Sequence, residues 1–223
     1  MFIVFFSLLA LATAFPMELL DPNEDYGAIF EGMFENDSEI CQEEVAKFKE
    51  CFKDVAEEAS QLSSSYSFPT QLEVAGSIEE VREALFCTGE VTCNKLIFSK
   101  YIIETGVYAV EHIYGDGYEC LENEASFKGT LAKCVMSVAS FDDIQSGNFD
   151  AIVSNLRPIA RCATDAQVCG NTEKTAFLRG SMALAEMTEV SLGLARAVQT
   201  GDDSFLNDFD KKFNAAEFDN LEL

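Results

Sequence analysis

Residues 41–62 read CQEEVAKFKECFKDVAEEASQL, and apolar side chains recur along this stretch at alternating intervals of four and three residues. That spacing places them on one face of an α-helix, with charged residues such as Lys47 and Glu57 largely on the opposite face. The stretch therefore predicts an amphipathic helix, which Ser63–Ser65 and Pro69 end. The positions on its apolar face are Cys41, Val45, Phe48, Phe52, Val55, Ala59 and Leu62.

The next segments continue the helical pattern. Ser77 and Glu80 match a Ser-x-x-Glu capping box, which predicts a short helix that ends at Thr88-Gly89. Residues 90–113 are rich in apolar and β-branched types, and their length favours a buried helix. A pair of strands is the alternative for such a run. Gly115–Gly117 ends the segment.

The rest of the chain shows four more helical faces and no convincing alternating strand. Pro158 must kink or interrupt the second of them, and the last predicts a short acidic amphipathic helix. We therefore expect an all-α fold, a disulfide-stapled helical domain of about six to seven helices. The four faces are Phe127, Leu131, Cys134 and Val138; Phe149, Ile152, Val153 and Leu156; Phe177, Gly180, Leu184, Met187, Ser191, Leu194 and Val198; and Phe205, Phe209 and Phe213.

The chain has eight cysteines, an even number that suits four disulfides formed in an oxidising compartment. Eight cysteines allow 105 full pairings, so the sequence leaves the connectivity open. None of them forms a Cys-x-x-Cys motif, so neither a zinc ribbon nor a thioredoxin-like site is indicated. The eight are Cys41, Cys51, Cys87, Cys93, Cys120, Cys134, Cys162 and Cys169.

The N-terminus has the features of a secretory signal peptide. Residues 2–12 are almost wholly apolar, but the run is too short to span a bilayer, which takes about 20 residues. It ends in the small residues Ala12-Thr13-Ala14, and Pro16 follows. We expect residues 1–14 to be removed on secretion, and we expect no membrane span in the mature, extracellular chain.

These features divide the chain into four parts. After the signal peptide, residues 15–38 are acidic without Lys or Arg, and we expect them to be mobile. They contain the N-glycosylation sequon Asn36-Asp37-Ser38. Residues 39–200 form the disulfide-stapled helical domain, and residues 201–223 form the acidic amphipathic C-terminal helix or tail.

Composition and motifs argue against several classes of function. Of the 223 residues, 15 are Lys or Arg and 39 are Asp or Glu, which gives a formal net charge of −24 that would repel nucleic acid. The only histidine is His112, and no nucleophile elbow or glycine-rich phosphate loop is present. Residues 21–32 resemble a calcium loop, but Tyr26 stands where glycine is needed and Gly32 where a bidentate Glu is needed. We therefore expect no enzyme activity, no cofactor and no metal site.

Ser146-Gly147 is the only Ser-Gly pair, and Asp142, Asp143 and Asp150 flank it. Serine followed by glycine near acidic residues is the context that the enzymes starting chondroitin chains favour, so Ser146 is a candidate glycosaminoglycan attachment site. The alternative is an ordinary turn, in which serine and glycine are common.

The signal ending at Ala14, the acidic lead and the spacing Cys41-x9-Cys51 on a helix occur here together. Two further closely spaced cysteine pairs follow, at 87 and 93 and at 162 and 169. Over about residues 40–170 this combination resembles secreted nematode matrix proteins with a chondroitin-proteoglycan-4-like domain. The resemblance implies an extracellular-matrix or eggshell component that is not an enzyme. The chain departs from that family in having few Ser-Gly sites.

Three functional hypotheses follow. The first is a secreted structural or interaction protein of an extracellular matrix, whose partners are other matrix proteins. On this hypothesis Phe205, Phe209 and Phe213 could dock on a partner, although rings at such positions more often pack on the protein's own core. The second is an extracellular carrier of a lipid or other small apolar ligand. The third is a secreted enzyme or inhibitor. The lack of a recognisable nucleophile–base set argues against the enzyme, whereas an inhibitor needs only an exposed loop such as residues 63–76.

Overall fold

The computed structural model describes residues 38–56, 70–121, 124–138, 154–200 and 204–223. Within these ranges every regular element is a helix, which confirms the all-α class. In this described part of the chain six helices are ten residues or longer, in line with the expected six to seven. The elements are α3 (Glu39–Cys51), α5 (Gln71–Thr88), α6 (Asn94–Tyr114), the 3-10 helix η2 (Tyr118–Leu121), α7 (Glu124–Val138), α10 (Leu156–Asp165), α11 (Asn171–Thr200), α12 (Ser204–Asn207) and α13 (Ala216–Asp219).

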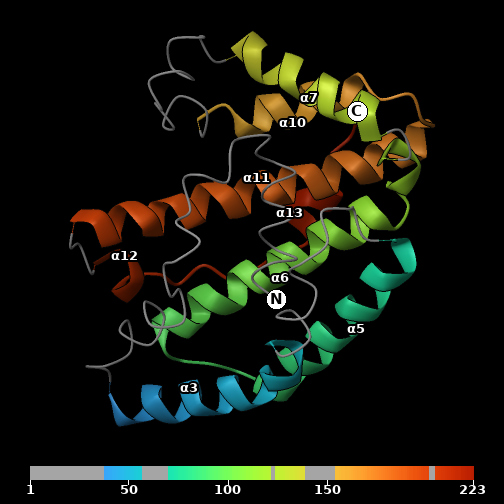
Figure 1. Ribbon diagram of the computed structural model, residues 1–223. Coiled ribbons are helices and arrows are strands. Elements are labelled where there is room, and N and C mark those ends of the chain that lie inside the picture. The colour runs from blue at the N-terminus through green and yellow to red at the C-terminus, as the bar shows by residue number, and fades with distance from the viewer. Residues whose placement is uncertain (1–37, 57–69, 122–123, 139–153, 201–203) are drawn as a thin grey trace.

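The helices form three layers (Figure 1). Helices α6 and α11 lie in the central layer, α3 and α5 cover one side, and α7 and α10 cover the other. Helix α6 belongs to both parts of the core, because Ile103 and Val107 pack with α3 and α5 while Ala109 and Ile113 pack with α7, α10 and α11. The domain is therefore organised around α6, with one half of the core on each side.

A glycine lets the two central helices approach closely. A Cβ atom at position 180 of α11 would lie 2.6 Å from the main-chain oxygen of Ala109 and 2.6 Å from Cγ1 of Ile113. Beside this contact, Leu178 and Ala183 have no exposed surface. Gly180 thus allows the backbones of α6 and α11 to lie in contact, because it has no Cβ atom.

Helix α5 starts earlier than the capping box at Ser77 predicted. It begins at Gln71, after a capping box in which the backbone N–H of Glu73 donates to Thr70 Oγ1 at 3.3 Å and that of Thr70 donates to Glu73 Oε2 at 2.7 Å. Ser77 lies within the helix and donates to the main-chain oxygen of Glu73. Both stretches match the motif, and in the structure the box forms at Thr70.

Two other expectations about helix boundaries can be compared with the structure. Residues 90–113 were expected to hold a helix or a strand pair, and they hold α6, which is buried on most sides. Pro158 was expected to kink or interrupt a helix, and this was wrong over the described residues. It is the third residue of α10, in the first turn, where its missing N–H needs no partner. The predicted face at residues 149–153 lies outside the described residues.

The first helix is also shorter than the apolar face predicted over residues 41–62. Helix α3 ends at Cys51, Phe52 is a turn residue, and residues 53–56 are again helical. Its start is capped by the Ser38 hydroxyl, which accepts a hydrogen bond from the backbone N–H of Cys41. The predicted positions Ala59 and Leu62 lie outside the described residues.

The C-terminal part does not form the single helix predicted through Phe205, Phe209 and Phe213. It forms α12, then residues 208–215 without regular helix, then α13. Phe209 contacts Tyr101 and Phe213 contacts Tyr108, two partners seven residues apart on α6, or about 10.5 Å along its axis. Four helical residues would advance only about 6 Å, whereas four extended residues can advance up to about 14 Å. The chain must therefore leave the helical conformation to make both contacts.

Candidate functional site

Four disulfides pair all eight cysteines, as the even number predicted. Two of them, Cys41–Cys93 and Cys51–Cys87, join α3 to the start of α6 and to α5. The other two join η2 to the segment before α11 and α7 to α10. These are Cys120–Cys169 and Cys134–Cys162. Each layer that flanks α6 and α11 is thus cross-linked separately, and no disulfide involves a residue after Cys169.

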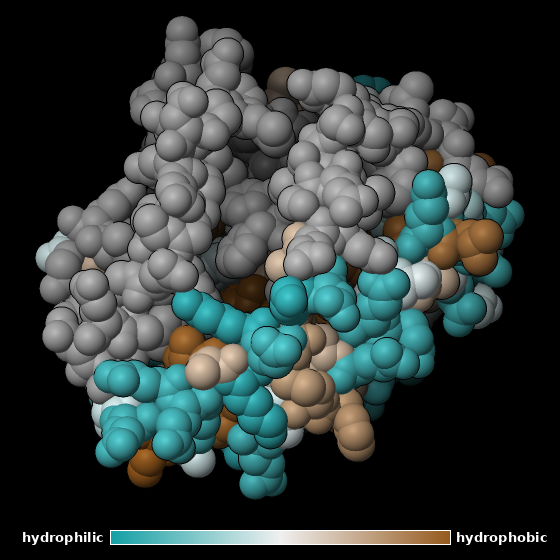
Figure 2. Space-filling model, turned by 60° about the horizontal axis from the view of Figure 1, so that its bottom comes forward, coloured by the Kyte–Doolittle hydropathy of each residue, from teal (hydrophilic) through white to brown (hydrophobic). Residues whose placement is uncertain are grey.

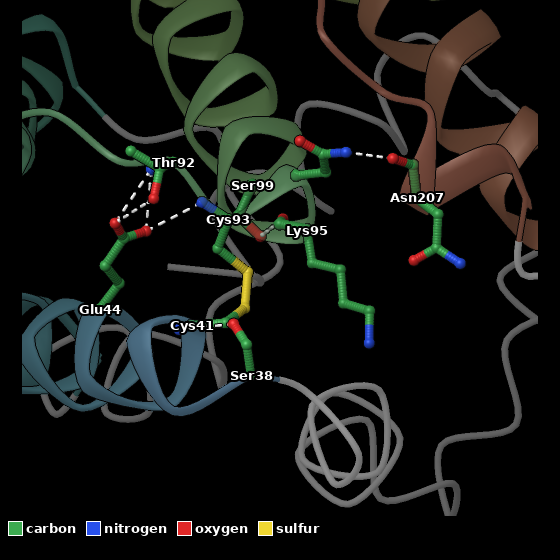
Figure 3. Close-up of a disulfide and its surroundings, with 9 residues drawn as sticks. Ser38, Cys41, Glu44, Thr92, Cys93, Lys95, Ser99 and Asn207 are labelled. Atoms are coloured by element: carbon green, nitrogen blue, oxygen red, sulfur yellow. Dashed lines mark hydrogen bonds between the residues drawn. A yellow bond between two sulfur atoms is a disulfide. The ribbon is translucent and has the colours of Figure 1, made fainter.

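The first disulfide lies beside a carboxylate that holds the start of α6 (Figure 3). Glu44 of α3 accepts hydrogen bonds from the backbone N–H of Thr92 at 2.9 Å, from its hydroxyl at 2.7 Å and from the backbone N–H of Cys93 at 2.9 Å. Partial burial raises the pKa of the Glu44 carboxyl, but these hydrogen bonds lower it by more, so the pKa lies below its usual value. A negative charge at a helix N-terminus is also favoured by the helix dipole.

The same helix provides a cation for the end of α5. Lys47 Nζ donates to the main-chain oxygen of Thr88 at 3.1 Å, and Lys100 of α6 donates to that of Gly89 at 2.8 Å. Gly89 adopts a φ of +68°, a conformation that glycine takes at little cost, and the helix ends there. Helix α3 therefore holds the N-terminus of one neighbour and the C-terminus of the other, each with the charge that the helix dipole favours.

A buried carboxylate joins the C-terminal residues to the central layer. The side chain of Glu186 on α11 is only 8% exposed, and it forms ion pairs with Arg157 of α10 and with Lys211. The Tyr101 hydroxyl donates to Glu186 Oε1 at 2.9 Å, and Lys211 Nζ lies 5.1 Å from the centre of the Tyr101 ring. Arg157 also pairs with Glu189 at 3.4 Å. We refer to these residues as the Glu186 network.

The Glu186 network shifts the pKa of its members in opposite directions. Burial raises the pKa of Glu186, but hydrogen bonds from Lys211 and Tyr101 and the charges of Lys211 and Arg157 lower it by more, so the carboxyl is ionised at neutral pH. Burial lowers the pKa of Lys211, and its contacts with Glu186 and Tyr101 raise it above its usual value. Sequence inspection missed this network. The one signal available was an acidic residue placed among the small and apolar residues of 182–188.

Residues 204–223, which we call the C-terminal strap, lie across α6 and α11. The Phe209 ring lies 5.1 Å from that of Phe98 and 5.6 Å from that of Tyr101, and the Phe213 ring lies 5.5 Å from that of Tyr108. The Phe205 ring lies 6.1 Å from that of Phe98. Phe205, Phe209 and Phe213 thus pack on the chain's own helix α6, which is the alternative to partner docking that the sequence left open.

Polar contacts hold the end of the strap. The Tyr108 hydroxyl donates to Asp219 Oδ1 at 2.7 Å, and both burial and this hydrogen bond raise the pKa of Tyr108. Arg179 of α11 donates to the main-chain oxygens of Asp219 and Leu221, and Arg161 of α10 donates to that of Glu222 at 3.2 Å. The two arginines thus bind main-chain oxygens of the strap, and these contacts do not depend on which side chains the strap carries at those positions.

A small apolar cavity lies between the end of α6, α7, α10 and α11. It has a volume of about 60 Å³, and its lining includes Phe127, Leu131, Ile159 and Phe177, with Ser181 the one polar residue among those that line it. For comparison, an apolar cavity that binds benzene has a volume of about 150 Å³. The cavity is thus of the right chemistry for an apolar ligand but smaller than any lipid chain.

The sequence also singled out a histidine, a loop and two modification sites. The Nδ1 atom of His112 is 3.0 Å from the main-chain oxygen of Tyr108, and its ring stacks on the Tyr108 ring at 4.0 Å. Residues 71–76 of the suggested inhibitor loop belong to helix α5. Asn36, Ser146 and the signal peptide lie outside the described residues.

Over residues 38–56, 70–121, 124–138, 154–200 and 204–223, no group of three or more His, Cys, Asp or Glu residues is arranged to hold a metal ion. In the same residues, no helix has both the length and the apolar character needed to cross a membrane.

No protein-family model, no curated protein and no solved structure matches this chain.

Proposed function

We propose that the chain is a secreted, non-enzymatic structural or interaction protein of an extracellular matrix, such as an eggshell or egg coat. The observation that carries the proposal is the pairing of all eight cysteines in four disulfides. Disulfides persist in extracellular compartments and are rare in the cytosol. The bridges close loops of 28 to 52 residues, and a bridge of this kind contributes roughly 2–4 kcal/mol to stability.

The charge of the protein supports a matrix role as well. A formal net charge of −24 attracts counterions and water, and it favours contact with cationic partners. Viewed from the side of α3, the described surface is largely hydrophilic, with apolar residues interspersed (Figure 2). Two large apolar side chains are almost fully exposed on α5, Leu72 at 84% and Phe86 at 89%. The matrix role is also the one implied by the resemblance to chondroitin-proteoglycan-4-like proteins.

Localisation of the endogenous protein tests the proposal. A C-terminal tag would be imaged in intact tissue, and its partners identified after cross-linking and purification. We expect the tagged protein in an extracellular layer together with other matrix proteins, and a variant without residues 1–14 should stay inside the cell. Uniform intracellular staining of the full chain would contradict the proposal.

Two modifications belong to the same proposal. Asn36 is the candidate site for an N-linked glycan, and Ser146 is the candidate site for a glycosaminoglycan chain, with an ordinary turn as the alternative at Ser146. If Asn36 is glycosylated, treatment with an N-glycosidase increases the mobility of the protein on a gel. If Ser146 carries a glycosaminoglycan, chondroitinase does the same. Asn36→Gln should abolish the first shift and Ser146→Ala the second. A protein from its natural source that shows neither shift would contradict both assignments and leave the matrix role to be decided by localisation.

The apolar cavity favours a second candidate function, an extracellular carrier of a small apolar ligand. Since its volume is about 60 Å³, a lipid chain would enter only if α7 and α10 moved away from α11. Organic extraction of the natural protein followed by mass spectrometry distinguishes the two functions. Stoichiometric lipid would support the carrier, and an extract without lipid would contradict it.

A further inference from the structure

We propose that the C-terminal strap of one molecule can exchange onto a second copy of the chain, where it takes the place of that copy's own strap. The inference rests on the proposed function, because it names a second copy of this chain as one partner in the matrix. The strap would bind the same residues of α6, α10 and α11 in the second molecule. We call these residues the strap-binding face, and they include Phe98, Tyr101, Tyr108, Arg161, Arg179 and Glu186.

The covalent structure allows the strap to leave. The four disulfides enclose residues 41–93 and 120–169, and the strap lies beyond both loops. Among the described residues, the chain enters the strap from α11. The strap can therefore detach while every disulfide stays intact, whereas α3, α5, α7 and α10 are each held by at least one bridge.

The contacts of the strap do not require it to belong to the same molecule. Its side chains contribute aromatic rings to α6 and the Lys211 ammonium to Glu186. Its backbone oxygens accept hydrogen bonds from Arg161 and Arg179. Because an exchanged strap would make all of these contacts again, exchange costs mainly the entropy of association.

Loss of the strap leaves the Glu186 carboxylate with partners. Arg157 and Tyr101 belong to α10 and α6, so they stay beside Glu186 when Lys211 departs. This makes Lys211 a position at which the strap can be weakened without leaving a buried charge alone. Lys212 is the matched control, since it is the next residue, is exposed and carries the same charge.

A peptide experiment tests recognition in trans. A fluorescently labelled peptide of residues 204–223 would be titrated with the full chain at physiological salt, using the wild type, Lys211→Ala and Lys212→Ala. The chain's own strap competes at an effective concentration in the millimolar range, so weakening it should favour the peptide. We expect the peptide to bind Lys211→Ala about tenfold more tightly than the wild type or Lys212→Ala. A peptide with Ser in place of Phe209 and Phe213 should not bind.

Equal affinity for the three proteins would overturn the proposal, and so would equal binding of a scrambled peptide of the same composition. The acidic charge of the chain makes the control sharp, because the peptide is also acidic overall and electrostatic attraction alone would not retain it.

Association of whole chains tests exchange itself. Purified full-length protein would be prepared with two different N-terminal tags that follow the signal cleavage site, mixed near millimolar concentration, and then diluted and captured through one tag. We expect the second tag to be captured as well, and Lys211→Ala to reach this state sooner. Capture of one tag alone, for both the wild type and Lys211→Ala, would overturn the exchange even if the peptide binds.

These results are separable from a failure of the proposed function. A chain that never exchanges but is found in an extracellular layer overturns this inference only. A chain that exchanges in vitro but stays inside the cell overturns the matrix role only.

Discussion

Replacement of Glu186 by glutamine should destabilise the fold and loosen the C-terminal strap. The change keeps an acceptor for the Tyr101 hydroxyl but removes the ion pairs with Arg157 and Lys211. Breaking a fully buried ion pair typically costs about 3–5 kcal/mol. Here the Arg157 and Lys211 side chains are 48% and 40% exposed, so water can solvate them and the cost is lower. We expect a loss of about 2 kcal/mol at pH 7.

The loss should depend on pH in a defined way. The pKa of Glu186 is lowered in the folded protein, so its contribution is complete above its unfolded pKa of about 4.3 and disappears as the pH falls through the lower folded value. The pKa of Lys211 is raised, so its contribution is complete below its unfolded pKa of about 10.4 and disappears as the pH rises through the folded value. The difference between wild type and Glu186→Gln should therefore be largest between these limits.

Urea unfolding followed by circular dichroism at 222 nm measures this difference. With a slope of about 2 kcal/mol per molar urea, the midpoint of Glu186→Gln should fall by about 1 M at pH 7 and by much less near pH 3. Glu43→Gln on α3 is the control, because it removes the same charge from an exposed side chain. A midpoint within about 0.2 M of wild type at pH 7, or an equal shift at both pH values, would refute the reasoning.

Three further predictions concern the core, the disulfides and the helix ends, each measured by the same unfolding assay. Gly180→Ala should lower the unfolding free energy by about 1–3 kcal/mol, because the added methyl group would meet the backbone of α6. Gly129→Ala should raise it by up to about 1 kcal/mol, because a Cβ atom there meets no atom within 4 Å. Equal effects would contradict the close approach of α6 and α11. Removing one bridge with the double substitution Cys134→Ala and Cys162→Ala should cost about 3–4 kcal/mol of unfolding free energy. The rate of amide hydrogen exchange should rise in α7 and α10 but not in α3. An equal rise in all helices would argue against separately cross-linked layers. Glu44→Gln should cost about 1 kcal/mol at pH 7 and little near pH 3, because the lowered pKa makes this contribution vanish at low pH; a cost independent of pH would contradict the role of its charge at the start of α6.

Helix periodicity predicted the class of fold because a stripe of apolar residues reports directly which face is buried. The stripe that includes Phe177, Leu184 and Met187 became α11, and the apolar segment after residue 90 became α6. Periodicity failed for Phe205, Phe209 and Phe213. A non-helical chain that runs along another helix can also place a ring at every fourth residue, as this one does with Tyr101 and Tyr108 of α6. The decisive information there is the position of α6, which the local sequence does not contain.

The start of α5 and the pairing of the cysteines could not be predicted, because the local sequence offers several equivalent possibilities for each. Two Ser/Thr-x-x-Glu stretches occur within residues 70–80, and the capping box forms at the first of them, Thr70. The even number of cysteines predicted that all would pair, but which thiols meet is decided by how α3 and α10 lie against their neighbours. Glu186 could not be assigned from the sequence, because its partners are 25, 29 and 85 residues away along the chain.

The most direct test of the central claim is a disulfide map of the protein collected from its natural source, with free thiols blocked before denaturation. We predict an N-terminus at Phe15, no blocked cysteine, and proteolytic fragments that link Cys41 to Cys93 and Cys51 to Cys87. The same map should link the remaining four cysteines as 120 to 169 and 134 to 162. Blocked thiols at several of these positions, or a retained N-terminal segment, would contradict the account of an exported chain locked by its own cross-links.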